Sequence, residues 1–292
     1  MTAQARRSLV EVLVGRGISV RRACVLLSVA RSGVGYVSRL VAKDMPLERL
    51  LRRFVERYPR RGYRQAWKWL RRRGHSVNRK RVYRLWCHAG LTLPRRKSYR
   101  RRRSGKRIDP VAGAPNEVWA SDFVQAYCAN GHKVRCLTVL DEYTRECLAL
   151  EVASSMPSER VVRTLAKLVD RFGAPKYLRT DNGSEFTARR TQQWLRAHGI
   201  QSALTDPGSP WQNGFVESFH SRLRDECLDR EWFHNVTEAR VIIEGHRRSY
   251  NTDRPHSSLG YRTPAEMRAD YDTKVDTEKS QLESQQSEIV PI

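Results

Sequence analysis

The chain has 292 residues, enough for one large domain or for two to three small ones, and a formal net charge of +24 at pH 7. Residues 1–107 carry 32 Lys and Arg against 4 Asp and Glu, whereas the remaining residues carry 23 against 27. A surplus so uneven favours a nucleic acid as partner over a merely solvated basic tail, and the lack of any apolar run of roughly 20 residues excludes an integral membrane protein.

Two helical segments with helix-turn-helix character are predicted in this basic part. In residues 19–40, Ser19 is suited to cap a helix, which is followed by a short break and a second helix, so we assign residues 1–45 to the first segment. Residues 46–93 form the second, with three short amphipathic helices. Residues 94–112 then read as a basic linker, because they are too poor in apolar side chains to form a core.

The polar faces of the second segment are rich in arginine and predict contacts with phosphates or base edges. For any single arginine, a charged helix surface without a ligand is the simpler interpretation, but the cluster as a whole favours nucleic acid. The residues of these segments and of the linker that we expect to bind DNA are Arg60, Arg61, Arg64, Arg79, Lys80, Arg81, Arg95, Arg96 and Lys97.

The sequence changes to an α/β pattern from about residue 113. Three consecutive β-type runs suggest an antiparallel meander, followed by a helix over 158–172 that Gly173 stops, and then by a strand, a helix, a strand and a long helix from about Pro210. The order β-β-β-α-β-α-β-α is that of an RNase H-like α/β domain, which we assign to residues 113–272. The residues 273–292, rich in Ser, Gln, Glu and Thr, predict a disordered tail.

A zinc site is disfavoured at the turn between the first two predicted strands. Cys128, His132 and Cys136 would supply only three ligands there. The six cysteines contain no C-x-x-C pair and no apolar signal segment opens the chain. Both observations predict reduced thiols and a cytoplasmic protein.

Three carboxylates stand where an RNase H-like sheet would bring them to one edge. Asp122 lies in the middle of the first strand, on a partly buried face. Asp181 follows a strand at its carboxyl end, where ligands gather in α/β sheets, although an ordinary Asp-Asn-Gly turn would look the same. Glu217 lies on the polar arc of a helix for which Ser209 and Gln212 predict a capping box.

Three acids from distant parts of the sequence that share one site would repel one another and demand a divalent metal. Hard oxygen ligands suit Mg²⁺, for which Mn²⁺ can substitute. Two such ions roughly 3.5 to 4 Å apart stabilise both the attacking and the leaving oxygen of an in-line phosphoryl displacement. The pattern therefore predicts phosphoryl transfer with two ions per active site.

Four motifs give the chain a resemblance to a known family over nearly its whole length. They are TrpAlaSerAsp at 119–122, ThrAspAsnGlySerGluPhe at 180–186, SerProTrpGlnAsnGlyPheValGluSerPhe at 209–219, and TyrAsnThrAspArgProHis at 250–256 leading to LeuGlyTyrArgThrPro at 259–264. With 35 residues between Asp181 and Glu217, the chain resembles the catalytic, second-reading-frame protein of the IS-three group of bacterial insertion sequences, relatives of retroviral integrases. Gly214 stands where the family pattern has Ala.

The resemblance implies a DDE transposase in which Asp122, Asp181 and Glu217 are the catalytic acids and the metal ligands. Water activated at that site would nick the end of the element, and the freed 3′-hydroxyl would attack a second phosphodiester bond. The polar residues on the arc of Glu217 and in the fourth motif that could contact DNA, or equally serve in packing, are Asn213, His220, Arg224, Arg254 and His256.

The resemblance also implies partners. They are double-stranded DNA, both as terminal repeats and as target, a homo-oligomer assembled on DNA, and an upstream-reading-frame protein or fusion, because the chain has no sustained heptad run; the protein would be bacterial and nucleoid-associated. Three alternatives stay open: an RNase H-like nuclease such as a junction resolvase that only hydrolyses, a domesticated DNA-binding protein with a decayed core, and a basic RNA-binding protein that uses residues 1–107.

Overall fold

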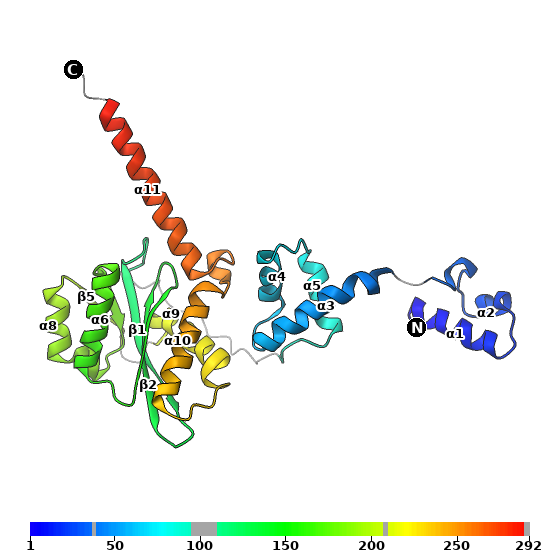
Figure 1. The fold of residues 1–292 in the computed structure, drawn as a ribbon, viewed down its shortest axis with the longest axis horizontal. Coiled ribbons are helices and arrows are strands. Elements are labelled where there is room, and N and C mark those ends of the chain that lie inside the picture. The colour runs from blue at the N-terminus through cyan, green and yellow to red at the C-terminus, as the bar shows by residue number, and fades with distance from the viewer. Residues whose placement is uncertain (37–38, 95–109, 207–209, 289–292) are drawn as a thin grey trace.

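A computed structural model describes residues 1–36, 39–94, 110–206 and 210–288 of the chain (Figure 1). The helical front part and the α/β core lie along one long axis, with the N-terminus at one end (Figure 1). Within these described ranges, no helix is both long and apolar enough to cross a membrane.

Two small helical bodies make up the front part. The first contains α1 (Ala3–Gly15), α2 (Val20–Leu26) and the 3₁₀ turn η1 (Arg31–Gly33), and it has a small core around Val10 and Ala23. Ser19 caps α2 as predicted, accepting a hydrogen bond from the backbone N–H of Arg22 at 3.4 Å.

The second helical body has a larger core, formed by α3 (Arg39–Arg57), α4 (Tyr63–Arg72) and α5 (Arg79–His88). Its three helices bury one face each, and the fully buried side chains include Leu51, Phe54, Ala66, Leu70 and Val82. Asp44 on α3 holds α5 through ion pairs with Arg81 and Arg84, both at 2.7 Å. Three helices around one apolar core are what the periodicity of 46–93 predicts.

A five-stranded sheet forms the centre of the α/β core, with the strand order β3-β2-β1-β4-β5. The strands β1 (Val118–Tyr127), β2 (Lys133–Asp141) and β3 (Cys147–Ala153) are the antiparallel meander that the sequence predicts. The strands β4 (Tyr177–Thr180) and β5 (Gln201–Leu204) join β1 in parallel after crossover helices. Three antiparallel strands followed by two parallel ones confirm the predicted order.

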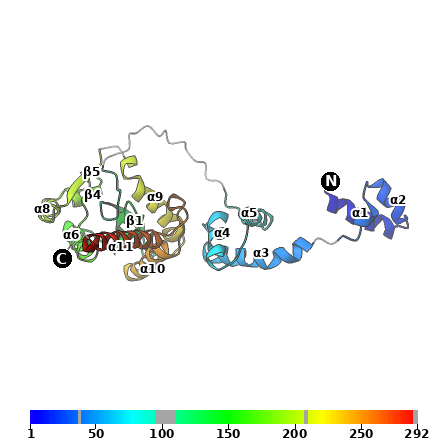
Figure 2. The same ribbon diagram turned by 90° about the horizontal axis from the view of Figure 1, so that it is seen from above.

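Helices cover both faces of this sheet (Figures 1 and 2). On one face, α6 (Ser158–Phe172), α7 (Ser184–Thr187) and α8 (Arg189–Ala197) pack on a cluster that includes Trp119 and Leu137. On the other face, α9 (Gly214–Leu223) and α10 (Val236–Thr252) pack on a cluster that includes Ala120 and Val124. Because side chains alternate along a strand, Asp122 shares the second face with its even-numbered neighbours and points toward α9.

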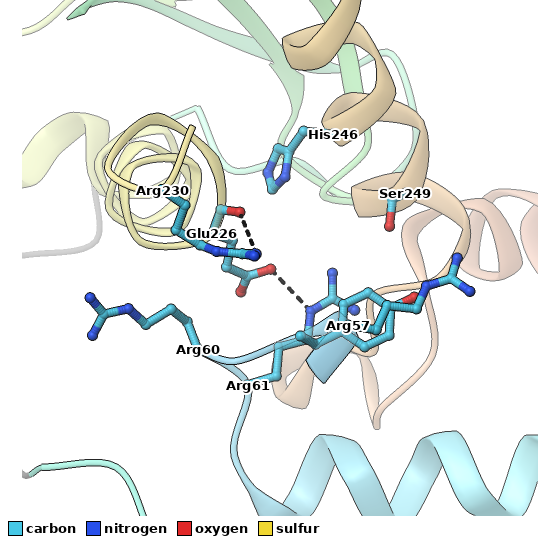
Figure 3. Close-up of a pocket in the computed structure, with 8 residues that line it drawn as sticks. Arg57, Arg60, Arg61, Glu226, Arg230, His246 and Ser249 are labelled. Carbon is cyan, nitrogen blue, oxygen red and sulfur yellow. Dashed lines mark hydrogen bonds and ion pairs between the residues drawn. The ribbon is translucent and has the colours of Figure 1, made fainter. Parts of the chain in front are cut away.

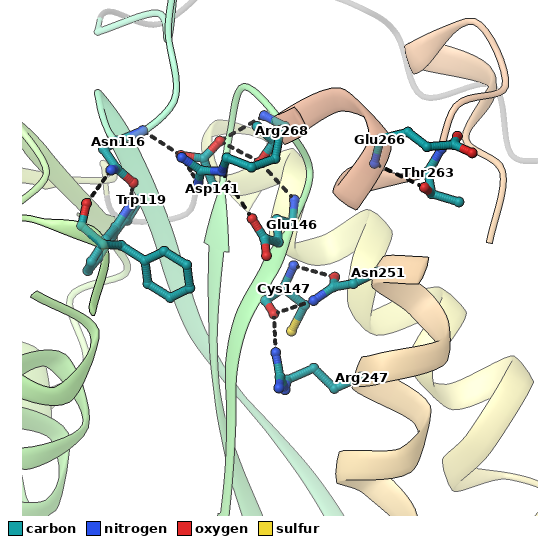
Figure 4. A network of polar contacts seen from close by, with 12 residues as sticks. Asn116, Trp119, Asp141, Glu146, Cys147, Arg247, Asn251, Thr263, Glu266 and Arg268 are labelled. Carbon is teal, nitrogen blue, oxygen red and sulfur yellow. Dashed lines mark hydrogen bonds and ion pairs between the residues drawn. The ribbon is translucent and has the colours of Figure 1, made fainter. Parts of the chain in front are cut away.

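The helix α10 is fixed to the sheet by a buried asparagine (Figure 4). Asn251 accepts a hydrogen bond from the backbone N–H of Cys147 and donates one to the carbonyl of the same residue, each at 2.9 Å. Arg247 on the same helix donates to that carbonyl at 3.0 Å. The motif that begins at Tyr250 therefore serves first to attach α10 to β3.

The C-terminal segment differs from the prediction of disorder. After the short helix η4 (Ser257–Leu259), α11 (Pro264–Glu288) continues as one helix that projects from the core (Figures 1 and 2). Thr263 and Glu266 form a reciprocal capping box at its start, with hydrogen bonds of 3.2 and 2.8 Å. The polar composition lacks an apolar face, but Glu, Lys and Gln are good helix formers, so a capped and anchored first turn propagates.

Candidate active site

Asp122 lies in the middle of β1, opposite Thr138 of β2. Its side chain is 27% exposed, so one edge of the carboxylate faces solvent while the remainder is enclosed by the α9 side of the sheet. Its Oδ1 accepts a hydrogen bond of 2.6 Å from the backbone N–H of Phe123. The strand thus presents a half-buried carboxylate at a fixed position.

Glu217 is carried by α9, the helix packed on the same face of the sheet. The helix is anchored by Val216, Phe219 and Leu223, which are buried against β1 and β2. These three residues leave Glu217 on the half-buried flank of the helix. The spacing of these buried apolar residues thus sets how α9 is rotated about its own axis, and with it the position of the Glu217 carboxylate.

The beginning of α9 differs from the predicted capping box. Ser209 lies outside the described residues, and a 3₁₀ turn over Pro210–Asn213 precedes α9. Gln212 donates to the carboxylate of Asp206 at 2.7 Å instead of capping the helix. At Gly214, the first residue of α9, an added Cβ would meet no atom within 4 Å, so the departure from the family's Ala costs no contact.

Asp181 follows β4 directly and is exposed. Its Oδ1 accepts a hydrogen bond of 3.1 Å from the backbone N–H of Gly183, so the Asp-Asn-Gly turn is present at the carboxyl end of the strand. Asn182 donates to the carbonyl of Thr205 at 2.7 Å and ties this turn to the end of β5. Asp181 therefore forms an Asp-Asn-Gly turn and also stands at the strand end where the sequence predicts a ligand site.

A second strut holds the turn after Asp181 to the sheet, and sequence patterns gave no indication of it. Arg135 on β2 forms an ion pair of 2.5 Å with Glu185. The guanidinium of Arg135 lies 4.4 Å from the ring centroid of Phe123, which stacks on Phe186 at 5.0 Å. The partners are 50 residues apart in the sequence, and only the folded sheet brings them together.

The three acids share one electrostatic field. Burial, together with the negative charges of Asp181 and Glu217, raises the pKa of Asp122 to about 6, against the opposing effect of the hydrogen bond from the N–H of Phe123. Other charged groups shift the pKa of a carboxylate in this way only when they lie close to it. The described residues contain no group of three His, Cys, Asp or Glu side chains drawn closely enough together to hold a metal without rearrangement. The acids are therefore close enough to interact electrostatically, but the described residues do not form a ready metal site.

The chemistry of this donor set fits divalent metal ions. It offers carboxylate oxygens only, the hard ligands that Mg²⁺ and Mn²⁺ prefer. The raised pKa of Asp122, caused mainly by burial, indicates that the fold disfavours the negative charge of this carboxylate. A cation between Asp122, Asp181 and Glu217 would stabilise that charge.

His220 and Asn213 flank the acids, as their positions on the polar arc predict. The Nδ1 of His220 lies 3.7 Å from Oδ2 of Asp122, and its Nε2 lies 2.9 Å from Oγ1 of Thr138. Burial, followed by the charge of Arg224, lowers the pKa of His220 to about 4, so the ring is neutral. Asn213 donates to the carbonyl of Ser121 at 3.2 Å, while its buried Oδ1 has no hydrogen-bond partner among the described residues.

The predicted DNA contacts at Arg254 and His256 need correction. Arg254 is 6% exposed and forms two hydrogen bonds, of 2.9 and 2.8 Å, with the carboxylate of Glu226. His256 is 9% exposed and packs edge-on against Tyr250, with ring centroids 4.8 Å apart. The charge of Arg254 can be buried because Glu226, which no sequence pattern singled out, compensates it inside the core. His256 is buried beside this pair.

The other basic residues that were predicted to bind DNA separate into three groups. Arg61 is 5% exposed and is also bound to Glu226, at 3.1 Å, so its guanidinium is internal, whereas Arg81 is paired with Asp44 but is 37% exposed. A second group lies outside the described residues and contains Arg95, Arg96 and Lys97. The predicted residues with exposed side chains are Arg60, Arg64, Arg79, Lys80 and Arg224.

Comparison with known proteins adds family membership to this geometry. An HTH-like domain family matches residues 43–99, and two integrase core domain families match residues 112–210 and 198–264. Among solved structures, the chain is similar to a chain of the simian T-cell lymphotropic virus intasome in complex with PP2A regulatory subunit B56 gamma, with a TM-score of 0.49, 16% identity, and coverage of 66% of this chain and 68% of that one.

Two sequence relatives come from bacterial insertion elements. An uncharacterized 31.7 kDa protein of the insertion element IS407 from Burkholderia multivorans is 39% identical over 263 residues, which cover 89% of this chain and 94% of the relative. The transposase InsD of the insertion element IS2 from Escherichia coli is 33% identical over 221 residues, which cover 71% of this chain and 73% of the relative. The chain is a DDE-type polynucleotidyl transferase in which an HTH-like domain precedes the integrase core. It belongs to the insertion-element transposases with an integrase core.

Proposed function

We propose that the chain cleaves the ends of its insertion element and joins them to target DNA, with Asp122, Asp181 and Glu217 as the catalytic triad. The observation that supports this assignment most directly is the raised pKa of Asp122, to which burial contributes most and the other two acids contribute next. Three carboxylates, carried by β1, by the turn after β4 and by α9, would form a site for metal-dependent phosphoryl transfer.

Two Mg²⁺ ions, or Mn²⁺ in their place, are the cofactors that we propose. When bound, they would neutralise the charge of the reacting phosphate and activate the attacking oxygen. The protein's own part is positioning. Asp122 is held by the strand, Glu217 by the packing of α9, and Asp181 by the turn that Asn182 ties to β5. The same site would serve two steps, with water as the first nucleophile and the freed 3′-hydroxyl as the second.

Asn213 and His220 have supporting roles in this proposal. The unpartnered Oδ1 of Asn213 can accept a hydrogen bond from the attacking water or hydroxyl. The neutral ring of His220 contacts Thr138, the residue of β2 that lies opposite Asp122 on β1. Because the ring carries no charge, it does not compete with a metal ion for the carboxylate.

DNA binding before chemistry would fall to the exposed basic residues of α4 and α5 and to the linker. We further propose a homo-oligomer on DNA, and an upstream-reading-frame protein as fusion partner. Action on chromosomal DNA would place the protein with the nucleoid of a bacterial cytoplasm.

The test is a cleavage and strand-transfer assay on labelled DNA that carries the ends of the source element, with Mg²⁺ or EDTA and with the upstream protein supplied. Glu217→Gln removes one charge with little change in shape, and Asp170→Asn on the exposed side of α6 is the matched control. We expect joined products only with metal, in the wild type and in the control. Hydrolysis without joining would favour a resolvase-like nuclease, and binding without cleavage would favour a domesticated DNA-binding protein.

A further inference from the structure

The HTH-like domain and the catalytic core meet at a buried carboxylate. Arg61, just before α4, donates to Oε2 of Glu226 at 3.1 Å, while Arg254 donates to Oε1 of the same carboxylate from the core side (Figure 3). All three side chains are at most 7% exposed. The ring of Tyr58 lies 4.0 Å from the guanidinium carbon of Arg61 and closes the junction from the side of the front domain.

The balance of charge at this junction is positive. Burial alone would raise the pKa of Glu226, but the Arg254 and Arg61 guanidinium groups outweigh it and lower the pKa to about 2. Glu226 is therefore ionised at neutral pH and compensates one of the two guanidinium groups. One positive charge remains in excess before any other residue is considered.

A cavity of about 110 Å³ opens beside this ion triad and adds three further arginines (Figure 3). Arg57 and Arg60 line it from the front domain, and Arg230 lines it from the core, where it donates to the backbone carbonyl of Glu226 at 3.4 Å. All three are exposed, and among the described residues none of them is paired with a carboxylate. With Arg61, four arginines and the single carboxylate of Glu226 line the cavity, and this excess of positive charge favours an anion.

The wall of the cavity on α10 supplies groups suited to the same ligand. His246 and Ser249 line it. The Nε2 of His246 is buried and has no hydrogen-bond partner in the part of the chain that the structure describes. A buried polar atom of this kind normally has a partner, and a bound oxygen atom would provide one.

We propose that this junction cavity binds one phosphate group of the DNA backbone, through Arg57 and Arg60 of the HTH-like domain and Arg230 of the catalytic core. The proposal rests on the proposed function, since DNA is the polyanion on which the chain acts. The ion pair between Arg61 and Glu226 holds the two walls together, so the site exists only when the domains are docked.

Docking at this point connects DNA binding with catalysis. Glu226 lies in the π-helical turn η3 (Arg224–Leu228), which continues α9 without interruption. The helix that carries Glu217 therefore also carries one wall of the phosphate site. A backbone phosphate bound there sets the distance between the DNA held by the front domain and the three acids.

The number of phosphates involved can be measured from the salt dependence of DNA binding. Each phosphate contact contributes about 0.9 to the slope of log K against log salt on B-DNA. Two arginines that share one phosphate should together account for about one contact, whereas two arginines with independent contacts would account for about two. We would compare the full-length wild type with Arg60→Gln, Arg230→Gln, the double variant and an Arg163→Gln control on the distant helix α6.

The expected result is that both single variants weaken binding to duplex DNA carrying the element's end, that the double variant reduces the slope by about one in total, and that the control changes nothing. Methylphosphonate substitution at one backbone position should then weaken the wild type without affecting the double variant. Unchanged slopes, or additive losses without such a position, overturn the proposal. Because strand transfer is measured separately, unchanged slopes with normal joining would leave the proposed function standing, and the predicted slopes without joining would refute that function alone.

Discussion

The Nδ1 of His220 lies 3.7 Å from Oδ2 of Asp122, and the imidazole ring of His220 is neutral because burial lowers its pKa to about 4. A neutral imidazole beside Asp122 can orient the carboxylate without neutralising its charge. The Nε2 bond to Thr138 fixes the ring from the opposite side. We therefore propose that His220 is a positioning residue for Asp122.

We predict that His220→Gln reduces strand transfer about 10- to 100-fold, the usual loss when a group that orients a metal ligand is removed. The apparent metal requirement should rise, and added Mg²⁺ should restore part of the activity. A metal titration of product formation measures both effects. Loss of activity at every metal concentration, with no shift in the titration, would contradict a positioning role.

A second prediction concerns the stability cost of Asp122. Its pKa in the fold is raised above the ordinary 3.8 to about 6, so the folded state disfavours the ionised form. The cost is absent below pH 3.8, grows as the pH rises toward 6 and is complete above that value. In EDTA at pH 8, Asp122→Asn should raise the free energy of unfolding by about 1 to 2 kcal/mol, after allowance for the partly exposed side chain.

Denaturant unfolding in EDTA with and without this substitution provides the measurement. The gain should be absent near pH 4, where the wild-type carboxyl is protonated, and Asp170→Asn should show no gain at either pH. Addition of Mg²⁺ should stabilise the wild type and leave the Asp122→Asn protein almost unchanged. An equal response of both proteins to Mg²⁺ would remove Asp122 from the metal site.

The third prediction follows from the burial of His256. Burial, and then the positive charge of Arg254, lowers its pKa to about 3 from the ordinary 6.5. The folded state holds the neutral ring, so its contribution to stability is complete above pH 6.5 and is lost as the pH falls toward 3. We expect the protein to lose about 2 kcal/mol of stability from this residue between pH 7 and pH 5.

The substitution His256→Phe keeps the ring contact with Tyr250 but removes the titration. The variant should therefore lose less stability than the wild type as the pH is lowered. Unfolding midpoints at pH 7, 6 and 5 test this difference, and parallel pH curves for the two proteins would contradict it. His246 contributes in the same direction, because burial lowers its pKa to about 4.

Sequence patterns were sufficient for the elements that positioned the acids. Helix α6 begins at Ser158 and ends at Phe172, as the apolar period and Gly173 predict. The face of Asp122 followed from simple alternation along β1. These features depend on local spacing, which a sequence displays directly.

The residues that sequence reasoning missed depend on contacts across long separations. Glu226 and Arg61 are 165 residues apart, and nothing around either residue marks it as half of a buried pair. For the same reason, Arg61 and Arg254 were expected on the DNA-binding surface, where most arginines of basic proteins lie. Whether a charge is buried depends on its counter-charge, which only the folded chain identifies.

The last prediction concerns the ranking of substitutions at this buried triad. Glu226→Gln leaves both guanidinium groups of Arg61 and Arg254 without a counter-charge, and breaking a buried pair in this way costs about 3 to 5 kcal/mol. Arg61→Gln leaves the pair between Glu226 and Arg254 intact within the core, at 2.8 Å, so the core should lose less than about 1 kcal/mol.

The two variants should therefore separate core stability from domain docking. Denaturant unfolding followed by the fluorescence of the core reports the first, and limited proteolysis between the front domain and the core reports the second. Arg61→Gln should increase cleavage between the domains at nearly unchanged core stability, whereas Glu226→Gln should affect both. Equal losses of core stability would mean that the junction folds as one unit with the catalytic core, because the guanidinium of Arg61 would then be as necessary to that core as the carboxylate it binds.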